Sequence, residues 1–187
     1  MARKFTKVKE NAFDNLQMNA GLLLNNFDPT GVTAIADDDI ISATTGGINA
    51  VATPTYVDLA DGVDNAPLNM KEFKEIESWE CTLSTTLIGA EVNVVALMLG
   101  ASDISADKIT PRMTLALTDF SDVWWVGDKA DGGMVAIHLM NALSSDGFNL
   151  QTNDKGKGEF SLTLMGHVSI ESQSVVPMEF YVTNNAE

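Results

Sequence analysis

The sequence predicts a mainly β fold, an antiparallel β-sandwich or partial barrel with one short flanking α-helix. Three observations carry this prediction. Apolar and polar residues alternate with period two along several segments, turns rich in glycine and aspartate separate these segments, and a single segment follows a helical period. Of the 187 residues, 45% are hydrophobic and 20% charged, which suits one packed domain. We therefore expect one domain over residues 1–187, with a flexible N-terminal arm over 1–12.

The clearest alternation runs from Ile76 to Ile88. Trp79, Cys81 and Leu83 fall on one side of this segment, whereas Glu80 and its neighbours Ser and Thr fall on the other. The same pattern predicts a long strand over 158–171, with Glu159 and Glu171 on its polar side. Further strands are expected over 48–59, 123–127, 134–143, 148–153 and 178–182. In the first of these, Pro54 indicates an edge strand or a bulge.

The N-terminal part of the chain is less decisive. Residues 16–24 alternate as a strand would, but their apolar residues, taken with Phe13 and Phe27, also fit a helix, so both structures remain open. Between Gly89 and Gly100, Val92, Val95, Ala96 and Leu99 follow the spacing i, i+3, i+4, i+7, which predicts one short helix with Gly100 as its C-terminal cap. Residues 60–70 are expected to form a long loop.

Charge and composition exclude several classes of function. Eleven Lys and Arg stand against 26 Asp and Glu, a net charge of −15, which argues against direct binding of DNA phosphates. The lone Cys81 is expected in the core as a small hydrophobic residue, and His138 and His167 are expected at the surface. No nucleophile elbow, phosphate loop or metal-ligand spacing occurs in the sequence. We therefore predict no enzyme, no cofactor, no metal site and no export signal or membrane span.

Short stretches spread along nearly the whole chain resemble the major tail (tail tube) proteins of long-tailed phages and prophages of Gram-positive bacteria. Each stretch is weakly specific, and their order along the chain makes the resemblance specific. They are Gln17-Met18-Asn19-Ala20-Gly21, Phe27-Asp28-Pro29, Ala43-Thr44-Thr45-Gly46-Gly47-Ile48, Ala52-Thr53-Pro54-Thr55-Tyr56, Asn69-Met70-Lys71-Glu72, Glu77-Ser78-Trp79, Lys108-Ile109-Thr110-Pro111-Arg112, Asp122-Val123-Trp124-Trp125-Val126-Gly127-Asp128 and Gly156-Lys157-Gly158-Glu159-Phe160 with Gly166-His167.

The resemblance implies a structural protein of the virion tail, made in the cytoplasm of the bacterial host. It implies that copies of the chain assemble into hexameric rings that stack into a hollow tube. A tape-measure protein occupies such a tube before genomic DNA passes through it without specific binding, and tail terminator and distal tail proteins cover its ends. These properties follow from the resemblance alone, and it carries no catalytic residues over to this chain.

Within that expectation, the acidity of the chain has a physical use. A tube wall lined with Lys and Arg would retain DNA, whereas an anionic wall repels phosphate and lets the duplex slide. Glu80, Glu159 and Glu171 are the predicted acidic residues facing the lumen. The predicted contacts between subunits lie in the long loop, in the tryptophan pair and in the basic N-terminal arm: Asp61, Asp64, Asn65, Pro67, Trp124, Trp125, Lys4 and Lys7.

An alternative of another class stays open at this point. A soluble β-sandwich that binds a carbohydrate or another ligand would need exposed aromatic side chains on one face. The adjacent Trp124 and Trp125 are the only such pair, and one of them should face the core while the other faces outward, because neighbouring side chains of a strand alternate.

Overall fold

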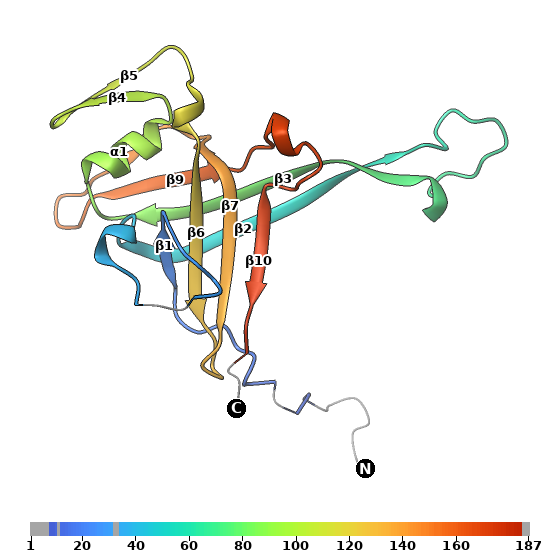
Figure 1. Cartoon of the computed structure of the whole chain (residues 1–187), viewed down its shortest axis with the longest axis horizontal. Helices are drawn as coiled ribbons and strands as arrows, with labels where there is room; N and C mark the ends of the chain where they lie inside the picture. The colour runs from blue at the N-terminus through green and yellow to red at the C-terminus, as the bar shows by residue number, and fades with distance from the viewer. Residues whose placement is uncertain (1–7, 11, 32–33, 185–187) are drawn as a thin grey trace.

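The computed structural model describes residues 8–10, 12–31 and 34–184 (Figure 1). The described strands and helix, in chain order, are β1 (Leu22–Leu24), β2 (Thr44–Asp58), β3 (Lys74–Leu87), α1 (Val92–Leu99), β4 (Ser102–Ser105), β5 (Lys108–Pro111), β6 (Ser121–Asp128), β7 (Met134–Ser144), β8 (Leu150–Gln151), β9 (Glu159–Met165) and β10 (Met178–Val182). Short 3₁₀ turns occur at Asp37–Asp39, Lys71–Phe73, Leu117–Asp119 and Ile170–Ser172. The predicted mainly antiparallel β fold with one α-helix is confirmed.

Eight of the strands form one antiparallel sheet that folds back over itself. Its order is β1-β6-β7-β9-β3-β2, with β10 paired to β7 and β8 paired to β9, whereas β4 and β5 form a separate hairpin. The strands β6, β7 and β10 run across the direction of β9, β3 and β2, so two layers face each other (Figure 1). Within the described residues the sheet stays open, since β1 and β2 lie at its two ends.

The strand β7 changes layers at a bulge. Two residues of β7, Met140 and Asn141, stand opposite Asp122 of β6, and Asn141 takes a positive φ of 47°. The backbone N–H of Asn141 donates to the Asp122 carboxylate over 2.9 Å, and its side-chain amide donates to the His167 carbonyl over 3.0 Å. A bulge bends a strand and increases its twist, so this fixed corner lets Leu143 and Ser144 pair with β9 in the other layer.

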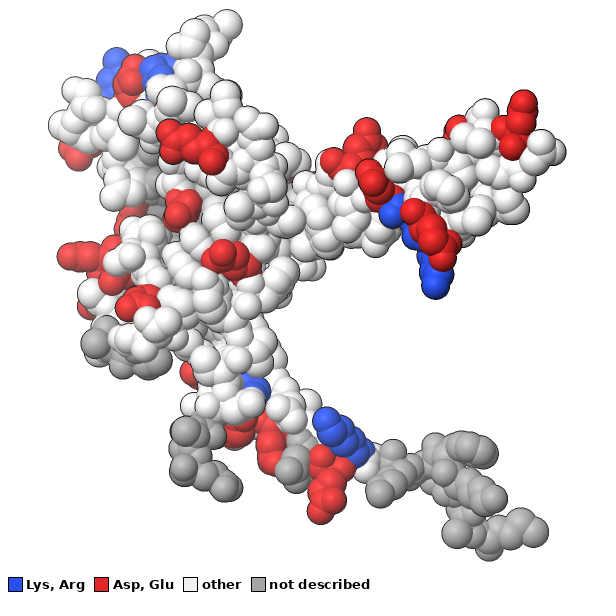
Figure 2. Space-filling model, turned by 45° about the vertical axis from the view of Figure 1, so that its right-hand side comes forward, with Lys and Arg blue, Asp and Glu red and all other residues white. Residues whose placement is uncertain are grey.

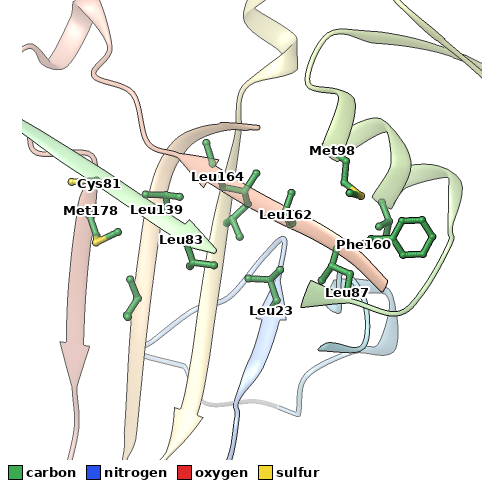
Figure 3. Close-up of a cluster of buried hydrophobic side chains, with 14 residues drawn as sticks. Leu23, Cys81, Leu83, Leu87, Met98, Leu139, Phe160, Leu162, Leu164 and Met178 are labelled. Carbon is green, nitrogen blue, oxygen red and sulfur yellow. The ribbon is translucent and has the colours of Figure 1, made fainter. Parts of the chain in front are cut away.

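The core lies between the two layers and follows the predicted alternation. Cys81, Leu83 and Leu87 of β3 point inward beside alternate residues of β9, and they meet side chains of β6, β7 and α1 (Figure 3). The expectation that Cys81 is a buried hydrophobic residue is confirmed, and its burial raises the pKa of the thiol. The predicted helix is confirmed too, with the N–H of Gly100 capping it on the Ala96 carbonyl.

The helix presents a different face to the core from the one that the sequence predicts. Val94 and Met98 are buried, whereas Val92, Val95, Ala96 and Leu99 are only partly covered. Seven of the eight helical residues are apolar, so the period alone could not select the buried side. The open question over residues 16–24 also has an answer, since Leu22–Leu24 form a short strand on β6.

A second, smaller cluster covers the other side of the layer that contains β6. Leu24, Trp124 and Ala136 are buried there under Phe27, Ile35 and Ile40, all outside the main core. The ring of Trp124 stacks on His138 at a centroid distance of 4.0 Å. The expectation that His138 lies at the surface is therefore wrong, because this cluster leaves only 14% of its side chain exposed.

The strand predicted over 158–171 is shorter than its pattern. It ends at Met165, and Ile170 and Glu171 lie in a 3₁₀ turn, so the expectation that Glu171 occupies a polar strand face is wrong. The alternation continues through Val168 and Ile170, but both are exposed, because no second layer of the described chain covers them. Backbone pairing ends where β9 leaves β3, at the level of Thr82.

Candidate functional site

The most distinctive surface belongs to a long hairpin that extends beyond the packed body of the domain. The strands β2 and β3 pair along their whole length, from Thr44 opposite Leu87 to Asp58 opposite Lys74. Only the half near Leu87 lies on the core, and the other half projects into solvent (Figure 1). We call residues 53–80 the hairpin arm. Every residue from Lys74 to Glu80 is exposed, whereas Cys81, Leu83, Thr85 and Leu87 are buried.

One face of the hairpin arm is apolar. The core-facing row of the sheet continues outward as the cross-strand pairs Pro54–Trp79 and Tyr56–Ile76, which we call the arm strip. Tyr56 and Ile76 are 57% and 49% exposed, so this row keeps its apolar character after it has left the core. The opposite face carries the pairs Thr53–Glu80 and Thr55–Ser78 and is polar.

A bulge at Glu77 keeps the arm strip continuous. In a regular strand, Ile76 would point to the face opposite Trp79, because they are three residues apart. The register shifts here, so that Ser78 pairs with Thr55 and Ile76 pairs with Tyr56, which leaves Glu77 as the extra residue. Ile76 therefore joins Trp79 on the same face. The predicted edge position of the strand around Pro54 is confirmed, and a bulge lies beside it.

The tip of the hairpin arm carries the predicted contact loop. Asp61, Asp64, Asn65 and Pro67 are all exposed there. The loop is closed by Asp58, whose carboxylate accepts the backbone N–H groups of Ala60 and Asn69 over 3.0 and 2.6 Å. These hydrogen bonds, that of Asn69 first, lower the pKa of Asp58. The loop thus has hydrogen-bonded structure of its own.

The sheet face away from the core forms a second candidate surface. Its rows across β2, β3 and β9 include Thr45–Thr86–Ser161 and Asn49–Ser84–Thr163, and these residues line a shallow hollow of about 430 Å³. Glu80 and Glu159 lie on this polar face, as the sequence predicts for strand positions, and Glu171 does not. None of the described residues of β3 or β9 that point to this face is Lys or Arg.

Basic side chains are few over the whole described surface. In Figure 2, Asp and Glu are spread over both the body and the hairpin arm, and Lys and Arg form only small isolated groups. On the polar face, a Lys reaches the rim, where Lys157 donates to the Thr45 hydroxyl over 3.1 Å. The surface is therefore one that repels phosphate rather than one that collects it.

The remaining predicted contact residues divide into three cases. Trp124 and Trp125 face opposite sides of β6, as adjacent strand residues must, but neither is a free outward platform. Trp124 is only 8% exposed, so the expectation that it contacts another subunit is not supported, and Trp125 packs on the core and donates to the Ala20 carbonyl over 2.9 Å. Lys4 and Lys7 lie outside the described residues.

A polar cluster of titratable groups surrounds His138 at the surface of the core. The two ring nitrogens lie 3.4 Å from Glu179 and 3.2 Å from Asp122. The Tyr181 hydroxyl donates to Glu179 over 2.6 Å, which lowers the pKa of Glu179 and raises that of Tyr181. The cluster ties the edge strand β10 to β7 and β6, and it contains no serine or cysteine nucleophile.

The described residues contain no group of three or more His, Cys, Asp and Glu side chains placed to hold a metal ion. Within the same residues, no helix is both long and apolar enough to cross a membrane.

No family model matches this chain, and no curated protein does either. Among solved structures, it is similar to a chain in the virion of a native gene transfer agent particle, with a TM-score of 0.42 and 11% identity over 94% of this chain and 99% of that chain. It is also similar to a chain in the C6-symmetric tail of an empty gene transfer agent particle, with a TM-score of 0.39 and 10% identity over 89% and 96%. At these values neither likeness decides the function.

Proposed function

We propose that this protein is a structural subunit of a phage tail tube, and that its copies assemble into hexameric rings that stack into a conduit for DNA. The observation that carries the proposal is the hairpin arm, whose apolar strip stays largely exposed within the described part of the chain. The hexameric number and the stacking come from the resemblance of the sequence to major tail proteins.

The arm strip supports self-assembly on physical grounds. Burying apolar surface stabilises a contact by about 25 cal/mol per Å², and a protein that works alone rarely keeps a continuous apolar row in water. Tyr56, Ile76 and Trp79 form such a row, held out on two paired strands. The bulge at Glu77 maintains the row well beyond the core, where a neighbouring molecule can cover it.

The edge of the sheet supports the same proposal. Among the described strands, β2 pairs with β3 alone, so its other side presents unpaired backbone groups. Proteins that stay monomeric protect long edges with Lys, inward charges, Pro, bulges or short strands. The strand β2 has a bulge at Gly46 and Gly47 and a proline at Pro54, but it contains no charged residue before Asp58. Between the bulge and Pro54, over residues 48–53, a strand from a second copy could therefore continue the sheet.

The polar face supports a role as the wall of the conduit. Its hydroxyl and amide groups, with Glu80 and Glu159, give a wet surface that offers little cationic charge to a phosphate backbone. DNA would pass such a wall without specific binding. A tape-measure protein inside the tube, terminator and distal tail proteins at its ends, and a location in the virion tail belong to the proposal through the resemblance.

The carbohydrate-binding alternative has lost its main support. Its predicted platform was the tryptophan pair, but Trp124 is buried against His138 and Trp125 packs on the core. The aromatic side chains of Tyr56 and Trp79 are exposed, but they lie in the arm strip beside Ile76, which we assign to self-assembly. No second function is therefore proposed.

A pair of matched double variants tests the proposal. Tyr56→Asp with Ile76→Asp places two charges on the arm strip, whereas Thr55→Asp with Ser78→Asp places two charges on the opposite face of the same arm. Sedimentation velocity of the purified full-length chains over a range of concentrations should show large assemblies for the wild type and the control, and monomers for the strip variant. Equal assembly of both variants would contradict a role for the arm strip.

The wall assignment has its own test. Glu80→Lys changes the charge of the polar face, and Glu171→Lys makes the same change away from that face. We expect tubes of the Glu80 variant to retain duplex DNA at low salt and release it at high salt, and tubes of the wild type and the Glu171 variant to retain none. DNA retention that is the same for both variants would show that the polar face does not line the lumen.

A further inference from the structure

An exposed apolar loop joins β5 to β6 at the top of the molecule in the view of Figure 1. Met113, Leu115 and Leu117 alternate in this loop with Thr and Ala, and we call these three residues the apolar knob. Met113 is fully exposed, Leu117 is 91% exposed and Leu115 is more than half exposed. Three large apolar side chains close together in water are costly for a protein that works alone.

The loop that carries the knob is held in place by Arg112. Its guanidinium pairs with Asp119 at the end of the loop, lies 2.9 Å from Asp103 of β4 and donates to the Thr114 carbonyl over 3.1 Å. The Asp119 carboxylate also accepts the backbone N–H of Ala116 over 2.7 Å. The loop is thus fixed before any contact forms, which reduces the entropy lost on binding.

The same chain also has a groove with apolar residues in its lining. This groove of about 380 Å³ lies where the hairpin arm leaves the body, between Trp79 and Ile76 on the arm and the segment 168–177. Val168, Val175 and Pro177 complete its apolar lining, and Glu77 is the one charged residue among those that line it. We call this hollow the arm-root groove. It is continuous with the arm strip, since Ile76 and Trp79 belong to both.

We propose that the apolar knob of one copy inserts into the arm-root groove of a second copy. This inference rests on the proposed function, in which the arm strip meets a neighbouring copy. The knob and the groove are different surfaces of one chain, so the contact is head-to-tail and can repeat from copy to copy, as a ring or filament requires.

Charge favours this occupant of the groove. The segment from Met113 to Thr118 carries no charge, and the one cation beneath it, Arg112, is already paired with two carboxylates. The knob therefore adds no unpaired charge to the contact, and Glu77 of the groove, which is exposed, has to stay at the edge of that contact. Because each copy has a net charge of −15, copies repel one another at long range, and a short apolar contact of this kind is suited to hold them together.

Disulfide formation between two single-cysteine variants tests the inference. Leu117→Cys and Val175→Cys each add one exposed thiol, and the natural Cys81 is buried and stays unreactive. The full-length variants, one of them with a longer tag, are mixed and mildly oxidised. We expect a covalent dimer with one copy of each variant, in at least about tenfold excess over dimers from either variant alone.

Three outcomes would overturn the inference. Covalent dimers of Leu117→Cys alone would indicate a knob-to-knob contact. Thr183 follows β10 and lines a different hollow, together with Phe27 and Met134. Dimers of Leu117→Cys with Thr183→Cys would place the knob in that hollow. If the wild type assembles but the two variants form no mixed dimer, the contact between knob and groove is refuted and the proposed self-assembly is not. A wild type that stays monomeric at every concentration would refute the proposed function as well.

Charge variants test the same contact without oxidation, through the protein concentration at which assembly begins. Leu117→Asp should raise the concentration needed for assembly at least about tenfold, because the knob can no longer enter an apolar groove. Thr114→Asp adds the same charge to the same loop at an exposed position and should leave assembly nearly unchanged. Equal assembly of the Leu117 and Thr114 variants would contradict the inference.

Discussion

The two halves of β3 show how one pattern leads to two different uses. From Cys81 to Leu87, alternate side chains are buried between the layers, and from Lys74 to Glu80 every side chain is exposed. Both halves pair with β2 in a single antiparallel ladder, and both keep an apolar row on the same face. The difference lies in what stands opposite that row: β6, β7 and α1 cover the first half, whereas the second half is only bordered, at Ile76 and Trp79, by the segment 168–177.

Alternation in the sequence therefore tells which side chains share a face, whereas burial depends on the neighbouring layer. A row that continues unburied indicates a covering partner in another molecule. The boundary between the two halves, at Cys81 and Trp79, should therefore separate residues that differ in folding stability and in thiol reactivity.

The largest expected effect is on folding stability. Leu83→Ala empties a fully buried site and should lower the free energy of unfolding by about 2–5 kcal/mol. Ile76→Ala lies on the same face of the same strand, but in the hairpin arm, and should lower it by about 0.5 kcal/mol or less. Urea denaturation of the monomer at low concentration measures both. Similar losses for the two variants would mean that the arm is part of the cooperative core.

The second prediction concerns thiol reactivity across the boundary. The raised pKa and full burial of Cys81 should make it nearly inert to a thiol reagent at pH 8 in the native protein. In a Trp79→Cys variant, the new thiol lies two residues further along the same face, beyond the core. It should react at least about tenfold faster than Cys81 in the monomer, because it needs no local opening. Equal reaction rates for the two thiols would contradict the placement of Cys81 inside the core and of residue 79 outside it.

The third and smallest effect is a pH dependence confined to the body. The hydrogen bond from Tyr181, and then the contact with His138, lower the pKa of Glu179 from its ordinary value of 4.5. A lowered pKa in the folded state stabilises the protein above the unfolded value and loses that contribution as the pH falls through the folded value. Glu179 is partly exposed, so solvent screening limits the effect to about 1 kcal/mol or less.

The variant Glu179→Gln should accordingly be slightly less stable than the wild type at pH 7, and the difference should shrink as the pH falls below 4.5 and through the lowered pKa of Glu179. Urea midpoints measured at several pH values give this comparison, with Ile76→Ala as a control whose small deficit should not change with pH. A Glu179→Gln deficit that grows on acidification would contradict the assigned direction of the shift.

Much of the architecture could be predicted from the sequence, because alternation and turn residues act locally. The strand around Leu83, the inward row of β9, the helix capped by Gly100 and the edge position of Pro54 all follow from such signals. The hairpin of β4 and β5 was missed, since its four-residue strands are too short to establish a period.

The candidate site was harder to predict, because it depends on what covers each surface. Alternation places Trp79 and Leu83 on the same face of β3 and predicts that both are buried. Only the arrangement of the layers shows that Leu83 is buried and that Trp79 lies in the exposed hairpin arm. One of Trp124 and Trp125 was expected to face outward, but Trp125 packs on the main core and Trp124 is covered by Phe27 and Ile35. Met113, Leu115 and Leu117 alternate as strand residues would, so the sequence does not show that they are exposed in a loop, and the ion pairs of Arg112 that hold this loop appear only in three dimensions.

The central claim is that the exposed row of the hairpin arm is covered by another copy of the same chain. Negative-stain electron microscopy of the concentrated, unmodified protein tests it most directly. The proposal predicts rings or striated tubes of uniform bore, which disappear when Tyr56 and Ile76 are both replaced by Asp. Isolated particles of monomer size at every concentration, with the same appearance in the double variant, would contradict it.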